Sequence, residues 1–419
     1  MTVGIVSHFF PPDLGGIPRL HSYAVRDYPR FGVRPVVVTR QSDQPNEVHA
    51  QSEDDVHRVA GYGQVFEAAR AALGGRRRGT RLFTSHEFGR QISAVSAKVV
   101  DLFRRHDVSL VNSHIYADLR IGVRVADELA VPHVHMAHSA YRSDEFVQEE
   151  AERLGTDSPI ALQEEIKATL KSAPVDVYVV HTEYLRGKYV ELGVDADRIV
   201  RVPPGVDLAV FRRDQRAADL IRNQFRIGDE VVITCPTLRK HGFDLLLHAF
   251  ARLTKRLPKP ARLVCCDIDR LPPEHATLAR KLKVDGRIIC SSIPAAAMAG
   301  LYSASHVVVL CSTEEGIGLP VLEARACGTP VVAHRFGPFL ELVRDQEDGL
   351  LVDVGDVDGL ADALESAATD PELRQSLVRQ GLATIHRYPH TNLAPQYIKV
   401  FRTVLEQPIG KWDPTAIPH

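Results

Sequence analysis

Short apolar runs alternate with longer segments of helical periodicity along the chain. Examples of these runs are VGIVS at 3–7 and VVITC at 231–235. Such alternation is typical of parallel strands joined by helical crossovers, because strands buried on both faces are apolar throughout. We expect two series of strands, the first at 3–7, 34–39, 108–112, 132–136, 176–180 and 199–203, and the second at 231–235, 262–266, 287–290, 307–311, 330–333 and 350–352.

Two series of strands predict two doubly wound α/β domains. A length of 419 residues agrees, because a single core rarely grows that large. The turn-rich stretch 203–214 separates the two series, so we expect an N-terminal domain over 1–208 and a C-terminal domain over 209–388. A helix is expected in 355–367, and a closing helix with a tail, within 389–419, is expected to pack back on the N-terminal domain.

Charge and composition exclude several function classes. The 51 Lys and Arg residues balance 53 Asp and Glu residues, so no global field attracts nucleic acid, and any anion site must be local. No leader or spanning segment is evident, which predicts a cytoplasmic protein. One basic run, Arg70, Arg76, Arg77, Arg78 and Arg81, is either a solvated loop or a contact with an anionic acceptor or a membrane surface, as a peripheral protein would make.

All six cysteines lie in the second half of the chain. Most of them end apolar runs such as RLVCC and VVVLC, and none forms a CxxC pair. Free cysteine behaves as a small hydrophobic residue, so we expect buried thiols and no disulfide bonds.

The most informative segment is 312–333, which follows the apolar run VVVLC. A loop with Gly316 and Gly318 leads into a helix that has Pro320 in its first turn and ends at Gly328. The carboxyl end of a parallel strand that feeds a helix N-terminus is where open α/β sheets bind anionic ligands. Glu315 and Glu323 would accept hydrogen bonds from neutral hydroxyls of such a ligand, or else serve only as helix-capping carboxylates.

The string EGIGLPVLEARACGTPVV, from Glu315 to Val332, resembles the retaining glycosyltransferases of family 4. PPGVDLAVF at 203–211 and GPFLELV at 337–343 are also similar to that family. The resemblance implies the GT-B architecture, two Rossmann-like domains with a cleft between them, and transfer of a sugar from a nucleotide diphosphate with retention of configuration. It implies that Glu315 holds the donor sugar and Glu323 the ribose. The loop residues that would bind the donor are Gly316, Ile317, Gly318 and Leu319.

Two further segments would contact the donor phosphates. FFPPDLGGIPRL resembles the opening glycine loop of the family, which would bring the backbone of Gly15 and Gly16 close to the ligand. The family usually carries an Arg and a Lys in the pattern GRL-x-x-x-KG, whereas this chain has CPTLRKHG at 235–242. The pattern is shortened here, so Arg239 and Lys240 are the candidates to stabilise the departing diphosphate.

Histidines follow two strands of the first series. His133 and His135 share a strand face and are expected in the core, whereas His138 lies where the family places a catalytic His against the donor sugar. His114 is a weaker candidate in the same region. No metal is expected at these histidines or at Asp267 and Asp269, because standard ligand spacings are absent and a DxD string belongs to another glycosyltransferase fold.

We therefore predict a retaining, metal-independent hexosyltransferase that uses a nucleotide diphosphate sugar, most simply a UDP-sugar, and no cofactor. The departing phosphate oxygen would take the acceptor proton, with Glu315 and His138 as the catalytic residues. Tyr141, Arg142 and His114 would contact the acceptor, which is a small molecule, a glycan or a lipid-linked sugar. The alternatives are a phosphorylase or epimerase of the same fold, and a non-catalytic nucleotide-sugar-binding protein.

Overall fold

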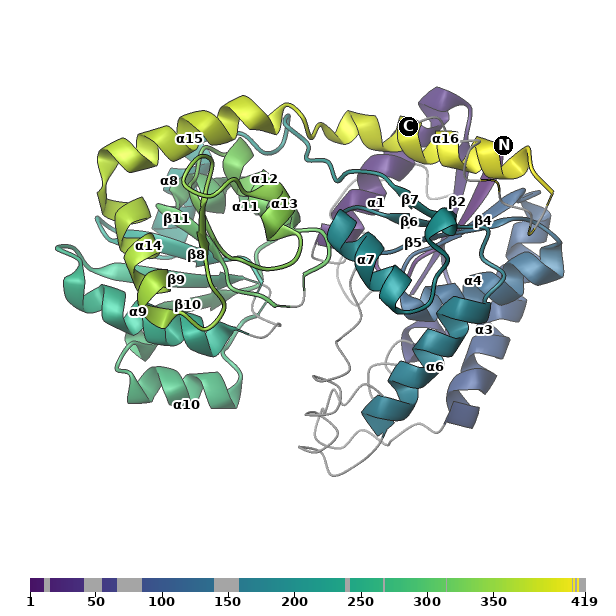
Figure 1. Cartoon of the computed structure of the whole chain (residues 1–419), viewed down its shortest axis with the longest axis horizontal. Coiled ribbons are helices and arrows are strands. Elements are labelled where there is room, and N and C mark those ends of the chain that lie inside the picture. Colours follow the sequence, from purple (N-terminus) through teal and green to yellow (C-terminus); the bar gives the residue numbers. More distant parts are fainter. Residues whose placement is uncertain are drawn as a thin grey trace. The chain divides into compact units, whose positions relative to one another are not determined.

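A computed structural model of the chain consists of two compact units, each built around one sheet. The N-terminal unit contains residues 1–13, 17–203 and 393–419, and the C-terminal unit contains residues 14–16 and 204–392 (Figure 1). The closing helix thus belongs to the N-terminal unit. The structure describes residues 1–10, 16–40, 55–65, 85–138, 158–237, 242–266, 268–313, 315–408, 410 and 413.

The N-terminal sheet has the strand order β3-β2-β1-β4-β5-β6-β7, and its strands pair in parallel. All six strands predicted for this half are present. The structure adds β3, a short edge strand of sequence VHR that carries no apolar run. The strand bounds are β1 (Thr2–Val6), β2 (Arg34–Thr39), β3 (Val56–Arg58), β4 (Leu110–Ser113), β5 (His133–Met136), β6 (Val177–Val180) and β7 (Ile199–Arg201).

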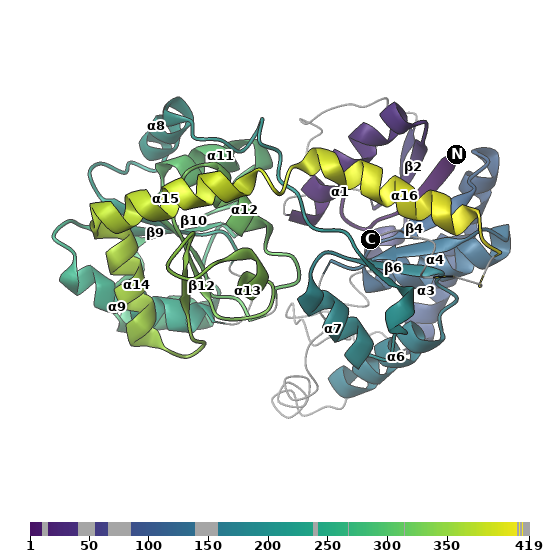
Figure 2. The same cartoon turned by 45° about the horizontal axis from the view of Figure 1, so that its top comes forward.

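Helices connect the strands of this unit as crossovers. The C-terminal helix α16 is not a crossover but packs on this unit, where the Phe401 ring lies edge-on against Tyr28 in the 3-10 helix η1 (Tyr28–Phe31), with ring centres 5.9 Å apart. Figure 2 shows α16 lying beside α1. The helices are α1 (Gly16–Asp27), α3 (Ser85–Arg105), α4 (Tyr116–Leu129), α6 (Ser158–Ser172), α7 (Glu183–Glu191) and α16 (Leu393–Leu405).

The C-terminal sheet has the parallel order β10-β9-β8-β11-β12-β13, which confirms the six strands predicted for this half. Both of its faces are apolar and buried, as expected for a parallel sheet between helical layers. The strand bounds are β8 (Val231–Cys235), β9 (Ala261–Cys266), β10 (Ile288–Ser291), β11 (Val307–Leu310), β12 (Val331–His334) and β13 (Leu350–Val352).

Two helical layers cover this sheet. The helices α8, α11 and α12 pack on one face, and α9, α10 and α14 pack on the other. The predicted helix in 355–367 corresponds to α14, and five of the six cysteines are buried as expected. The bounds are α8 (Gln215–Gln224), α9 (Phe243–Arg256), α10 (Pro273–Lys281), α11 (Ala295–Ala304), α12 (Leu319–Ala326), α13 (Phe339–Leu342), α14 (Val357–Thr369) and α15 (Pro371–Ile385).

No helix in the described part of the chain is both long enough and apolar enough to cross a membrane.

Candidate functional site

The C-terminal sheet reverses its strand order at β8. The next strand in the chain, β9, pairs with one edge of β8, and β11 pairs with the other. Loops that leave the carboxyl ends of β8 and β11 therefore diverge, and open α/β sheets bind their ligands at such a point. The loop after β8 contains 236–242, and the loop after β11 contains Glu315. Two segments singled out in the sequence thus start from neighbouring strand ends.

Gly242 ties the first of these segments to the end of β11. Its φ is +102°, and an ideal Cβ built on it would lie 2.0 Å from the carbonyl oxygen of Cys311. No other residue fits there, since a side chain would overlap the backbone of the neighbouring strand end. The start of α9 is therefore held against the segment that leads to Glu315. Arg239 and Lys240, just before Gly242, lie outside the described residues.

The Glu315 carboxylate is bound to the backbone of its own loop. Its Oε1 accepts hydrogen bonds from the amides of Gly316 and Gly318, at 3.2 and 3.4 Å. Gly318 has a φ of +78° and directly precedes α12, while Ile317 and Leu319 are buried and anchor the loop. A ligand that takes these amides must displace the carboxylate, which would then be available for a hydroxyl.

Glu323 lies on α12 with its side chain inside the unit, 3% exposed. Its Oε2 accepts a hydrogen bond of 3.0 Å from the hydroxyl of Tyr302, a fully buried residue of α11. A buried carboxylate requires hydrogen bonds to offset the loss of water, and Tyr302 supplies one of them. Tyr302 was not identified in the sequence, because it lies 21 residues from Glu323 and has no distinctive spacing.

The N-terminal sheet has its own reversal point between β1 and β4. His114 follows β4 and His138 follows β5, so both candidates emerge at the carboxyl edge of this sheet, and both are buried. The Nε2 atom of His138 lies 2.9 Å from Nδ1 of His114 and 3.0 Å from Nε2 of His21 on α1. Burial lowers the pKa of all three imidazoles, that of His21 to about 3. His21 was missed in the sequence because it is 117 residues from His138.

A buried carboxylate holds the loop after β1 in place. Asp118 on α4 accepts hydrogen bonds from the backbone amide of His8 at 3.0 and 3.1 Å, from the amide of Ile115 at 3.2 Å and from the hydroxyl of Tyr62 at 2.6 Å. Burial raises its pKa to about 7, against the effect of these hydrogen bonds. The backbone at His8, just after β1, is thus anchored near the same sheet edge.

His133 and His135 are core residues, as the strand alternation predicts. Both are fully buried, and Ser113 Oγ on β4 lies 2.8 Å from Nε2 of His133 and 2.9 Å from Nδ1 of His135. Asp269, from the DxD string, accepts a 3.0 Å hydrogen bond from the amide of Ser292. The remaining candidates lie outside the described residues: Gly15, Tyr141, Arg142, Asp267 and the basic run at Arg70, Arg76, Arg77, Arg78 and Arg81. Gly16 is the first residue of α1.

Two family models match the chain in succession. The model described as Glycosyltransferase Family 4 matches residues 14–210, and the model described as Glycosyl transferases group 1 matches residues 217–383. A D-inositol 3-phosphate glycosyltransferase from Kribbella flavida is 31% identical over 71% of this chain and 72% of its own length. The chain belongs to the family 4 glycosyltransferases. The enzyme of the same description from Segniliparus rotundus is 30% identical over 76% of this chain and 72% of its own length.

Solved glycosyltransferase structures share the fold of this family 4 protein. The match to the sucrose-phosphate synthase of Thermosynechococcus elongatus covers 97% of this chain and 99% of the synthase. The TM-score is 0.76 at 19% sequence identity. Anabaena HepE in complex with UDP-glucose covers 96% of the chain and is itself covered completely, with a TM-score of 0.71 at 17% identity. These similarities confirm the GT-B fold of two Rossmann-like domains. The chain is a glycosyltransferase, and its family transfers sugars from nucleotide donors.

Proposed function

We propose that this glycosyltransferase moves a hexose from a UDP-sugar to a hydroxyl of a small acceptor, with retention of anomeric configuration. The observation that carries the proposal is the loop of Glu315 and Gly318, which leaves β11 at the reversal point of the C-terminal sheet and starts α12. The fold neighbour HepE was solved with UDP-glucose, which supports a uridine donor.

In the proposed complex the donor diphosphate takes the amides of Gly316 and Gly318, which now bind Glu315. The released Glu315 carboxylate accepts hydrogen bonds from donor sugar hydroxyls and fixes the sugar for attack. Arg239 and Lys240 neutralise the negative charge that grows on the leaving diphosphate. Stabilisation of charge that develops in the transition state is usually the largest single contribution to catalysis. Glu323 accepts from the ribose, with Tyr302 holding its other oxygen.

The acceptor hydroxyl attacks the anomeric carbon from the face that the diphosphate leaves. Its proton passes to the departing phosphate oxygen, so the reaction needs no separate base, no divalent metal and no cofactor. The family resemblance makes Gly15, Gly16 and His138 further proposed donor contacts, His138 with the donor sugar, and a membrane contact through the Arg76–Arg78 run stays a hypothesis.

The acceptor is chosen by the N-terminal unit, where Tyr141, Arg142 and His114 are the proposed contacts. The curated relatives are described as acting on D-inositol 3-phosphate, so a phosphorylated polyol is the first acceptor to test. A growing glycan and a lipid-linked sugar are the second and third acceptor classes to test.

The experiment is a transfer assay with a panel of UDP- and GDP-sugars and the three acceptor classes, with products read by mass spectrometry and anomeric configuration by NMR. The proposal expects a product with the anomeric configuration of the donor, release of UDP, and full rate in EDTA. An inverted product, or activity lost in EDTA and restored only by manganese, would contradict it. Inorganic phosphate as co-substrate would instead identify a phosphorylase.

A non-catalytic nucleotide-sugar-binding protein is the second candidate, favoured by the altered segment 235–242. Calorimetry separates the two. UDP binding without transfer or hydrolysis on any acceptor would support the binding protein, whereas turnover on any of them would exclude it.

A further inference from the structure

Three buried imidazoles converge in the N-terminal unit. His21 comes from α1, His114 follows β4 and His138 follows β5, and one ring nitrogen from each lies within 4.8 Å of the other two. Among the described residues, no other group of three or more His, Cys, Asp or Glu side chains is arranged in this way. The rings of His114 and His138 lie end to end in nearly one plane, with an interplanar angle of 6° and centres 5.2 Å apart.

The hydrogen bonds of His21 limit how many protons this cluster holds. Its Nδ1 lies 2.9 Å from Ser7 Oγ and 3.2 Å from the carbonyl oxygen of Phe9, which can only accept. A neutral His21 therefore carries its proton on Nδ1 and presents a lone pair at Nε2. One proton on Nε2 of His138 then serves two acceptors, Nε2 of His21 and Nδ1 of His114.

This arrangement leaves buried ring atoms without partners. In the described part of the chain, Nδ1 of His138 and Nε2 of His114 accept or donate no hydrogen bond. Three nitrogen atoms thus surround one shared proton. His114 and His138 each use only one of their two ring nitrogens in a hydrogen bond. A single cation bound by all three lone pairs would take the place of that proton, which then moves to Nδ1 of His138.

We propose that His21, His114 and His138 bind one transition-metal ion of the Zn²⁺ type. Neutral imidazoles are the commonest ligands of such ions, and three of them with an open fourth position form a recognised zinc set. Zinc–nitrogen bonds of about 2.0–2.1 Å in a tetrahedron place nitrogen atoms about 3.3 Å apart. The observed 2.9 and 3.0 Å are a few tenths of an ångström shorter, so the rings must move apart and turn their lone pairs toward a common point when the ion enters.

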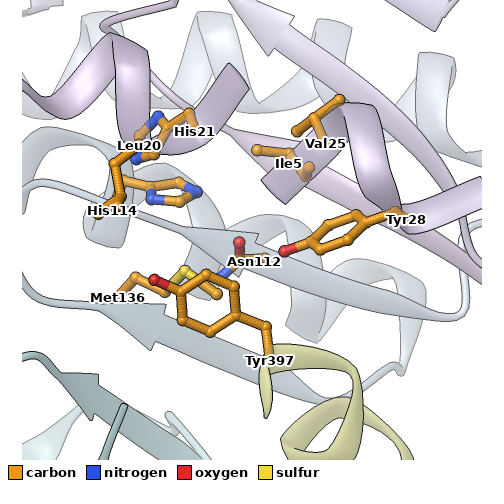
Figure 3. Close-up of a pocket in the computed structure, with 9 residues that line it drawn as sticks. All are labelled: Ile5, Leu20, His21, Val25, Tyr28, Asn112, His114, Met136 and Tyr397. Atoms are coloured by element: carbon orange, nitrogen blue, oxygen red, sulfur yellow. The ribbon is translucent and has the colours of Figure 1, made fainter. Parts of the chain in front are cut away.

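The surroundings fit a metal site in two ways. Metal-bound histidines usually donate their second N–H to an oxygen, as Nδ1 of His21 is placed to do toward Phe9 and Ser7. A cavity of about 10 Å³ adjoins His21 and His114, with room for about one water molecule (Figure 3). Asn112 and Tyr397 line this cavity, and their Oδ1 and hydroxyl oxygen have no hydrogen-bond partner among the described residues, so they are the polar groups that a water there would bond.

Occupancy would switch transfer off. This consequence, unlike metal binding itself, rests on the proposed function, in which His138 contacts the donor sugar. An ion that takes Nε2 of His138 fixes its ring and competes with that contact. The metal-free protein is then the active form, in agreement with the expected activity in EDTA.

The test is a titration of the metal-free, full-length protein with Co²⁺ and with Zn²⁺ in competition with a chromophoric chelator. We expect one equivalent of either ion and visible cobalt absorption of a tetrahedral complex. His21→Gln and His114→Gln should each weaken Zn²⁺ binding at least tenfold. His135→Gln is the matched control, because His135 is equally buried but bonded to Ser113, and it should bind Zn²⁺ as the natural protein does.

Absence of cobalt bands in the natural protein would overturn the site without recourse to any variant. Equal zinc affinity in the natural protein and in correctly folded His21→Gln would also overturn it. Zinc uptake by a protein whose metal-free form shows no glycosyl transfer would leave the metal site standing and contradict the proposed function instead.

Discussion

The two units of this glycosyltransferase share a parallel-sheet design but place different chemistry at the carboxyl edge of the sheet. In the N-terminal unit, buried imidazoles follow four of the strands, at His8, His114, His138 and His181. In the C-terminal unit, the buried strand ends carry thiols such as Cys235 and Cys311. The first edge thus carries imidazole bases, whereas the second carries weakly acidic thiols and one buried imidazole, that of His334.

One buried carboxylate of each unit, Asp348 and Asp118, differs in the donors that it accepts from. Asp348 of the C-terminal unit pairs with Arg325 and accepts a 2.7 Å hydrogen bond from the amide of Arg344. The hydrogen bonds to Asp118 of the N-terminal unit come from backbone amides and from Tyr62. Neutral hydrogen-bond donors offset less of the free-energy cost of burying a carboxylate than a cation does. The stability of the N-terminal unit should therefore depend more on pH.

The largest effect on stability is expected from Asp348→Ala. It leaves Arg325, which is 2% exposed, as an unpaired buried charge, and should lower the free energy of unfolding of the C-terminal unit by about 3–5 kcal/mol. Urea unfolding followed by pulse proteolysis, with cleavage sites mapped to each unit, measures this. Asp353→Ala removes an exposed partner of Arg335 and should cost at most about 1 kcal/mol. Equal losses of unfolding free energy in Asp348→Ala and Asp353→Ala would contradict the claim that Asp348 stabilises a buried arginine.

Asp118→Ala should lower the free energy of unfolding of the N-terminal unit by about 2–3 kcal/mol. It leaves the amide of His8 and the hydroxyl of Tyr62 buried without their acceptor. The same proteolysis assay should show the loss in the N-terminal unit alone. A smaller loss at pH 8 than at pH 5 is expected, because ionisation of a carboxyl with a pKa near 7 already costs stability at the higher pH.

Acid should unfold the N-terminal unit first. The buried histidines His133 and His181 have folded-state pKa values lowered to about 3 and about 4, from the ordinary 6.5. The unfolded chain therefore binds more protons as pH falls below 6.5, and the stability that these groups contribute above that pH is lost. Asp118 has a raised pKa, so its contribution to the stability of the folded state increases as pH falls. It is a single group, however, whereas several imidazoles act in the other direction. Unit-resolved unfolding at pH 7.5 and 5 should show the N-terminal unit losing more stability, and an equal loss in both units would contradict this.

A smaller and more specific effect is expected at Glu323. Glu323→Ala should raise the KM for the nucleotide sugar about tenfold with a lesser change in kcat, because ribose contacts are made in ground state and transition state alike. Tyr302→Phe removes only the hydrogen bond to Glu323 and keeps the carboxylate. It should therefore change KM less than Glu323→Ala does, and the reverse order would argue for a purely structural Glu323.

The strands could be predicted from sequence because buried parallel strands are short, continuous apolar runs. β3 was missed since Val56–Arg58 is a partly exposed edge strand with a single apolar residue. The glycines and carboxylates of the Glu315 loop were identifiable because the loop is one contiguous segment. The histidine cluster was not, since His21 and His138 meet only when α1 packs near the end of β5. The partners Tyr302 and Asp118 likewise come from tertiary packing that leaves no local pattern.

The central claim is that the C-terminal unit holds the donor through Glu315. Steady-state kinetics of Glu315→Ala, compared with the natural protein and with Glu347→Ala, whose carboxylate is 65% exposed, tests it most directly. We predict at least a 100-fold loss of kcat in Glu315→Ala, which is about 2.7 kcal/mol of transition-state stabilisation, and none in Glu347→Ala. A folded Glu315→Ala protein that turns over at the natural rate would contradict the claim.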